Sequence, residues 1–135
     1  MTGPDEVRLS VPAMPEFLRL IRVTAAGLGS RLGFSYDEVE DLRLAIDELC
    51  IGLTGKTGRD GTVDVRFRVD GDALEVTAEG HFGDNAVFTP HESAWSRIIL
   101  EALVDDHELA PGPEGPRFRL VKRTASPRPP AAAPA

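Results

Sequence analysis

The residues best suited to chemistry lie on the stretch 35–53. Glu48 is followed four residues later by Gly52, and residues four apart lie one above the other on a helix. A carboxylate in that place could act as a general base or contribute to a metal site, whereas Gly52 offers no side chain. The plainer interpretation of Glu48 is a solvated carboxylate, because charged helix faces are common. The spacing alone does not separate the two.

A second candidate is the segment Glu79-Gly80-His81-Phe82-Gly83. Its glycines could let the backbone approach a phosphate, or the segment could be a plain turn. His81, together with the other two histidines of the chain, lacks the spacing of a zinc site, so we expect ordinary polar residues. The sequence contains no GxSxG, P-loop or kinase-type glycine motif. These residues alone identify no function.

The helix that must position Glu48 is well specified. Ser35 followed by Glu38 predicts a capping box at its start, and apolar residues recur along one helical face. A preceding helix is predicted over residues 15–31, with Gly33 as its C-cap, and a third over 93–106. The predicted apolar face of the third helix consists of Trp95, Ile98, Ile99, Ala102 and Leu103. Trp95 is expected to be a core or interface anchor.

Alternating apolar and polar residues predict strands over 6–11, 62–69, 73–78 and 117–121. A further short strand is possible near 107–109, and residues 79–92 are predicted to be a loop. Residues 70–72 join two of the strands as a hairpin. Because helices and strands are segregated rather than alternating, we expect an α+β fold. Its mostly antiparallel sheet would be covered on one face by about three helices.

Composition limits the function classes. The 135 residues predict one domain over 1–123, followed by a disordered Pro/Ala-rich tail over 124–135. The formal net charge of −7 argues against direct nucleic-acid binding and suits a basic protein partner. The sequence holds no apolar run of membrane-spanning length, and its start is not a signal peptide, so we expect a cytoplasmic protein. The single Cys50 is expected in the core.

The segment FSYDEVEDLRLAIDELC, the hairpin after it and the run IILEALVDDHEL resemble the anti-sigma-factor serine kinases over about residues 6–123. These are partner-switching regulators with a histidine-kinase/Hsp90-like (GHKL, Bergerat) ATP-binding domain. The sequence is most similar to diverged actinobacterial-type members that bind a stress-response sigma factor. The resemblance implies a two-layer α/β sandwich and the cofactors ATP and Mg²⁺.

Residue by residue, the resemblance implies a degraded catalytic site. Glu48 stands at the family's catalytic glutamate, but Gly52 stands where an asparagine holds Mg²⁺. Glu79 replaces the aspartate that reads adenine, His81 replaces the first glycine of that box, and Gly83 keeps the second. The glycines of the second box fall on Ala94 and Ser96, and the ATP lid is shortened to about 84–92. Without the metal ligand and these glycines, we expect kinase activity to be lost or severely weakened.

The same resemblance implies binding partners. Arg22 stands where a family arginine contacts the sigma factor, although a solvated helical arginine is an equally good interpretation. A STAS-type anti-sigma-factor antagonist would compete for overlapping surface, and family members form homodimers through the sheet side. Three hypotheses follow: an anti-sigma factor that sequesters a sigma factor, an active ATP-dependent serine/threonine kinase acting on the antagonist, and a scaffold or dimerisation domain with another partner.

Overall fold

A computed structural model describes residues 5–83 and 93–125 of the chain. Five strands and three helices follow one another in the order β-α-α-β-β-α-β-β. The strands are β1 (Asp5–Pro12), β2 (Gly61–Asp70), β3 (Ala73–Phe82), β4 (Asp106–Pro111) and β5 (Pro116–Arg123). The helices are α1 (Pro15–Leu32), α2 (Tyr36–Thr54) and α3 (Ala94–Leu103).

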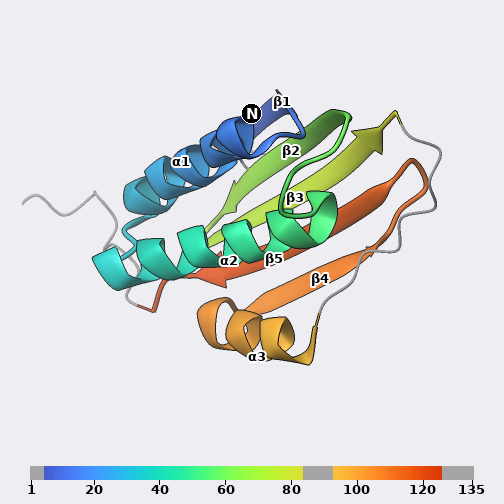
Figure 1. Cartoon of the computed structure of the whole chain (residues 1–135). Helices are drawn as coiled ribbons and strands as arrows, with labels where there is room; N and C mark the ends of the chain where they lie inside the picture. Colours follow the sequence, from blue (N-terminus) through green and yellow to red (C-terminus); the bar gives the residue numbers. More distant parts are fainter. Residues whose placement is uncertain (1–4, 84–92, 126–135) are drawn as a thin grey trace, which may run out of the picture.

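The strands form one sheet in the order β1-β2-β3-β5-β4, and every neighbouring pair is antiparallel. The helices lie together on one side of this sheet (Figure 1). The predicted α+β class, with two layers and one covered face, is confirmed. The sheet is antiparallel throughout its described strands, where the sequence predicted a mostly antiparallel one. The possible strand near 107–109 is real and forms β4.

The central helix, α2, begins as the sequence predicts. Ser35 Oγ accepts a hydrogen bond from the Glu38 backbone N–H (3.1 Å), and the Ser35 N–H donates to Glu38 Oε1 (2.8 Å). This capping box satisfies two N–H groups that have no partner inside the helix. The preceding helix, α1, ends at Gly33, whose φ of 94° is left-handed and favours glycine.

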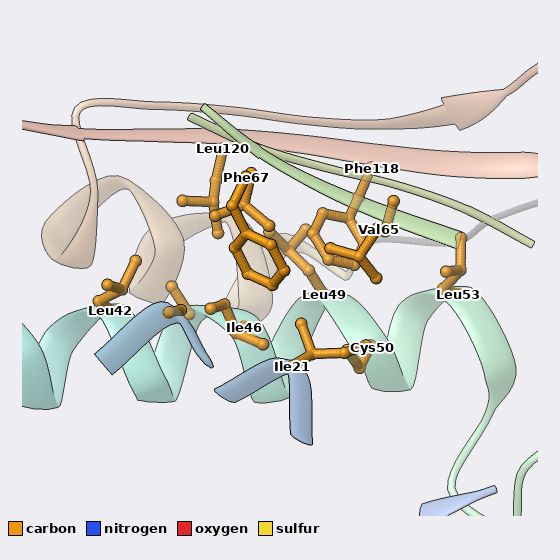
Figure 2. Close-up of a cluster of buried hydrophobic side chains, with 14 of the residues drawn as sticks. Ile21, Leu42, Ile46, Leu49, Cys50, Leu53, Val65, Phe67, Phe118 and Leu120 are labelled. Carbon is orange, nitrogen blue, oxygen red and sulfur yellow. The ribbon is translucent and has the colours of Figure 1, made fainter. Parts of the chain in front are cut away.

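Apolar side chains between α1, α2 and the sheet form the core. Phe67, Phe118 and Leu49 are at most 1% exposed, and the side chains of α1 and α2 point toward those of β2 and β5 (Figure 2). Cys50 is buried in the same cluster, as predicted. Burial, together with the charge of Asp47, raises the pKa of its thiol to about 12. Cys50 is therefore a neutral packing residue at physiological pH.

The prediction of a loop from residue 79 is wrong for its first four residues. β3 continues to Phe82, because β2 begins at Gly61 and supplies a hydrogen-bonding partner for each of these positions. Cross-strand pairing therefore outweighs the turn preference of Gly80 and its neighbours. Residues 84–92, the rest of the predicted loop and the shortened lid, lie outside the described residues.

The predicted apolar face of the third helix is confirmed only in part: Ile99 and Leu103 are half-buried, whereas Trp95, Ile98 and Ala102 are exposed. α3 is shorter than predicted, ending at Leu103, whose carbonyl accepts a hydrogen bond from Lys122 Nζ (2.6 Å). Leu100 is the buried residue of α3, whereas Trp95 and Ile98 are 70% and 60% exposed. The helix carries apolar residues on two sides, so periodicity could not tell which side is covered.

The C-terminal end of β5 is tied to the start of α2. Thr124, which is buried, donates its hydroxyl to Glu38 Oε1 (3.0 Å), and the Ala125 N–H donates to Glu38 Oε2 (2.7 Å). Partial burial raises the pKa of Glu38, but the hydrogen bonds from Ser35, Ala125 and Thr124 together lower it below its ordinary value. These first two residues of the predicted tail thus make specific contacts, and residues 126–135 lie outside the described part.

None of the helices in ranges 5–83 and 93–125 has both the length and the apolar character needed to cross a membrane.

Candidate functional site

The structure brings Glu48 and Ser96 together from positions far apart in the sequence. Ser96 Oγ, near the start of α3, donates a hydrogen bond to Glu48 Oε2 on α2 (3.0 Å). Ser93 holds Ser96 in place: its side chain accepts from the Ser96 N–H (3.0 Å) and donates to Ser96 Oγ (3.1 Å). A short chain of hydroxyl groups thus ends on the carboxylate predicted to be catalytic.

A cavity of about 410 Å³ lies beside this pair, between α2, α3 and β4. Its polar lining residues are Glu48, Lys56, Ser93 and Ser96, and Gly52 lies among them. Its apolar lining includes Leu49, Ile51, Leu100 and Leu109. The predicted glutamate, the residue at the Mg²⁺-ligand position and one residue of the second glycine box therefore share one site. Ala94 begins α3 next to it and contributes no polar side-chain group.

This cavity does not hold the ligands that Mg²⁺ requires. Mg²⁺ demands near-octahedral oxygen coordination, and Gly52 has no side-chain oxygen to add to Glu48. In the described ranges, a cluster of three or more metal-binding side chains occurs only at Glu79, His81 and Glu114, none of which lines this cavity. The residues present do not fit a Mg²⁺–ATP site of the kinase type.

Glu79 is not part of the Glu48 site. Successive side chains of a strand point to opposite faces of its sheet. Ala78 and Gly80 are buried on the helix-covered face, whereas Glu79 and His81 lie on the open face, where they line a separate cavity. The residues of this box on the helix-covered face are therefore Gly80, which has no side chain, and Phe82, whose ring has no polar group with which to read a base.

The space beside Gly80 is filled from within the chain. A Cβ atom added at Gly80 would collide with the ring of Phe82, and the guanidinium of Arg59 lies 4.3 Å from the centre of that ring. Gly83, the retained glycine, donates its N–H to the Asp60 carbonyl (3.0 Å). The glycine box thus serves to join the end of β3 to the loop after α2.

Arg22, the predicted partner contact, links two helices. Its Nη1 donates to Asp47 Oδ2 at 2.8 Å, between α1 and α2, and its side chain is 30% exposed. It lines a shallow groove of about 140 Å³ together with Arg19, Ile51 and Lys56 among others. Arg22 therefore has a structural role that the sequence did not reveal, and its exposed part still faces solvent.

The helices also expose large apolar side chains. These are Phe17, Leu20 and Val23 on α1, Tyr36, Leu44 and Ile51 on α2, and Trp95 and Ile98 on α3. The last two belong to the apolar face predicted for the third helix, where Trp95 was expected to be a core or interface anchor. The sequence does hold a signal for this exposure. An amphipathic helix needs one apolar face to cover the core, and α3 has apolar residues on two sides, so one of those sides must be exposed.

The comparisons with known proteins agree with the kinase resemblance. No protein-family model matches the chain. It is similar to the serine-protein kinase RsbW of Bacillus subtilis (strain 168), with 43% identity over 75 residues, covering 53% of this chain and 47% of the relative. The corresponding protein of Bacillus pumilus is 43% identical over 77 residues, which are 53% of this chain and 48% of that protein.

Another relative, the serine-protein kinase RsbW of Bacillus cereus (strain B4264), is 31% identical over 96 residues, covering 70% of this chain and 58% of the relative. The chain thus spans about half the length of the curated relatives it matches. The similarity to proteins named as serine-protein kinases confirms that part of the resemblance. The GHKL assignment and the actinobacterial type stay predictions.

Proposed function

We propose that this chain is an anti-sigma factor of the partner-switching type, which sequesters an RNA polymerase sigma factor and has a degenerate nucleotide site. The observation that carries the proposal is the Glu48 site. In a chain similar to serine-protein kinases, the predicted catalytic carboxylate accepts a hydrogen bond from Ser96, and Gly52 provides no metal ligand. A regulator of this kind acts through protein contacts, and it works in the cytoplasm, where sigma factors are.

Phosphoryl transfer depends on positioning and on metal-assisted stabilisation of charge. The described residues at Glu48 supply a carboxylate and hydroxyl groups but no partner carboxylate or amide for a cation. Phe82 fills the space beside Gly80, a helix-facing position of the first glycine box. These features favour a protein that keeps the scaffold for binding.

The helix layer offers a surface suited to a protein partner. Trp95 and Ile98 stand exposed on α3, and a tryptophan surrounded by other apolar groups is the usual kind of binding hot spot. Arg22 lies on the same layer, where its bond to Asp47 fixes its position. The net charge of −7 complements the basic DNA-facing surface of a sigma factor and would speed association.

Co-expression with each sigma factor of the source genome, followed by pull-down and a transcription assay, tests the proposal. We expect one sigma factor to be retained and its transcription to be inhibited. Trp95→Ala should weaken that binding about 30-fold, the effect of a typical aromatic anchor of about 2 kcal/mol. Tyr36→Ala is the matched control, because Tyr36 is 79% exposed at the start of α2. Retention of no sigma factor would contradict the proposal.

The alternative function is an active ATP-dependent serine/threonine kinase that phosphorylates an anti-sigma-factor antagonist. Retained Glu48 and the names of the relatives favour it. Calorimetric titration with ATP and Mg²⁺ separates the two, because a kinase must bind this pair and our proposal expects no heat. Gly52→Asn adds the missing side-chain oxygen. If this variant binds ATP in a metal-dependent way and the wild type does not, the result supports loss of the nucleotide site through the glycine at position 52.

The proposal extends to a STAS-type antagonist that competes with the sigma factor, and to a homodimer. Both rest on the resemblance of the sequence to the partner-switching kinases. Sedimentation of the purified chain tests the dimer, and displacement of bound sigma factor by a candidate antagonist tests the competition. A monomer at micromolar concentration would remove the dimer from the proposal without affecting sigma-factor binding.

A further inference from the structure

The open face of the sheet carries a histidine between carboxylates. His81 Nε2 lies 3.0 Å from Asp64 Oδ2 and 3.3 Å from Glu79 Oε1, and His81 Nδ1 lies 3.9 Å from Glu114 Oε2. Ligand atoms of Glu79, His81 and Glu114 lie within 4.8 Å of one another. All four residues line a cavity of about 590 Å³ on this face.

The backbone fixes this arrangement. Asp64 on β2 is paired directly with Glu79 on β3, and His81 lies two residues further along the same face. The turn between β4 and β5 brings Glu114 to the other side of the imidazole. It approaches β3 so closely at Gly115 that a Cβ atom there would collide with the Gly80 carbonyl. Three separate segments of the chain therefore converge on one histidine.

The cluster carries more negative charge than its own residues balance. Within the described ranges, the ion pairs of Asp64, Glu79 and Glu114 are made with His81. The nearby Arg8 and Arg66 pair instead with Glu6, and Arg117, which lies directly opposite Glu79 on β5, pairs with Glu108. Like charges directly opposite each other on neighbouring strands destabilise a sheet, as Asp64 and Glu79 do here. A bound cation would offset that repulsion.

We propose that Asp64, Glu79 and His81 Nε2 bind a divalent transition-metal cation of the Zn²⁺ class on the open face. In tetrahedral coordination with bonds of about 2.0–2.1 Å, neighbouring ligand atoms are about 3.3 Å apart. The 3.3 Å between His81 Nε2 and Glu79 Oε1 matches that edge, and the 3.0 Å between His81 Nε2 and Asp64 Oδ2 is slightly shorter than it. Water or an external ligand completes the coordination sphere.

Glu114 has the position of an outer partner. A carboxylate that accepts a hydrogen bond from the second ring nitrogen orients a metal-binding histidine. Glu114 Oε2 is 3.9 Å from Nδ1 on a largely exposed side chain, so a small rotation brings it into hydrogen-bond distance. The imidazole ligand selects Zn²⁺ over Mg²⁺ and Ca²⁺, which prefer oxygen alone. This site lies on the opposite face of the sheet from Glu48.

Titration of the full chain with ZnCl₂, followed by calorimetry and by competition with a chromogenic chelator, tests the proposal. We expect one site per chain in the wild type, with no comparable heat for MgCl₂ or CaCl₂. His81→Ala should weaken binding at least about 100-fold, and Glu114→Gln about 10-fold, the range found for outer partners. His107→Ala on β4 is the matched histidine control and should leave the affinity unchanged.

A second readout guards against misfolded variants. Asp64→Asn removes both a ligand and the like-charge pair, so the metal-free variant should melt at or above the wild-type temperature. ZnCl₂ should then raise the melting temperature of the wild type and not that of the variant. Absence of zinc binding by the wild type, or equal affinities of the wild type and His81→Ala, would overturn the proposal.

Discussion

The two faces of the sheet present different kinds of side chain. The covered face carries Val63, Phe67 and Phe118, which are fully buried beneath the helices, and the Glu48–Ser96 pair lies in this helix layer. The open face carries charged pairs and the cluster around His81. Among the described residues that line the Glu48 cavity, Glu48 is the one carboxylate, whereas the cluster richer in metal ligands lies on the open face, away from the nucleotide site that the resemblance implies.

This difference shows how strand alternation redistributes a motif. Glu79, Gly80 and His81 are consecutive, so a linear comparison assigns them all to one nucleotide site. In β3 they alternate, and only Gly80 faces the helices. Shifting the alignment of the two sequences by one residue therefore assigns each side chain of the motif to the opposite face of the sheet.

The largest expected effect tests whether stability comes from the covered face. Phe67→Ala should lower the free energy of unfolding by about 3–5 kcal/mol, because a fully buried aromatic is lost and a cavity is left. Arg66→Ala, at the next position but on the open face, should change it by about 0.5 kcal/mol or less. Urea unfolding at equilibrium measures both. Similar losses of unfolding free energy in the two variants would show that the covered face contributes no more to stability than the open face.

The tie between α2 and the end of β5 should give the next largest effect. Glu38→Gln weakens the capping box and the bonds to Thr124 and Ala125, at an expected cost of about 1–2 kcal/mol. Because folding lowers the pKa of Glu38, its contribution is complete above the ordinary value and is lost as the pH falls through the lowered one.

The difference in unfolding free energy between wild type and Glu38→Gln should therefore be full at pH 7 and shrink in acid. Urea unfolding over a series of pH values checks this. Glu40→Gln is the control, since among the residues that the structure describes Glu40 pairs with Arg43 on the same helix. A pH-independent difference would show that the Glu38 charge is not what holds the chain end.

The charged pairs of the open face should contribute less. Arg119 lies 2.9 Å from both Glu75 and Asp106, and its hydrogen bond lowers the pKa of Asp106. Arg119→Gln should cost about 0.5–1 kcal/mol at low ionic strength, because the pairs are partly exposed. That cost should nearly vanish in about 1 M salt, where charges are screened within about 3 Å. A loss unchanged by salt would indicate packing rather than charge.

The last effect, similar in size to that of Arg119→Gln but opposite in sign, concerns Gly52. Its φ is not positive in this structure, so the backbone conformation suits alanine, and Gly52→Ala should stabilise the chain by up to about 1 kcal/mol. Thermal unfolding measures it. Destabilisation would mean that the helix needs glycine at this position for packing, and would weaken the interpretation of Gly52 as a lost ligand.

The sequence was most informative where one local pattern decided the structure. The capping box at Ser35, the turn at Gly71 and the burial of Cys50 were each predicted correctly. Local patterns failed where distant strands or two apolar faces decided the outcome. Pairing with β2 extended β3 to Phe82, and α3 leaves Trp95 exposed, which excludes the core role of the two expected for it and leaves the interface role as a prediction.

Of the candidate site, the sequence predicted the Glu48–Gly52 helix and the neighbourhood of Ser96. It could not predict the Ser96–Glu48 hydrogen bond or the Arg22–Asp47 pair, because both depend on how helices pack. Asp64 and Glu114 escaped notice because cross-strand register and a hairpin turn bring them to His81. No spacing in the sequence encodes that approach.

The most direct test of the central claim is the affinity for the sigma factor retained in the pull-down, measured by calorimetry with and without Mg²⁺–ATP. Our account predicts binding whose Kd is the same in both conditions, because the Glu48 site neither holds Mg²⁺ nor responds to nucleotide. A Kd that falls more than about tenfold with Mg²⁺–ATP would reveal coupling between nucleotide and sigma-factor sites. That result would contradict the account.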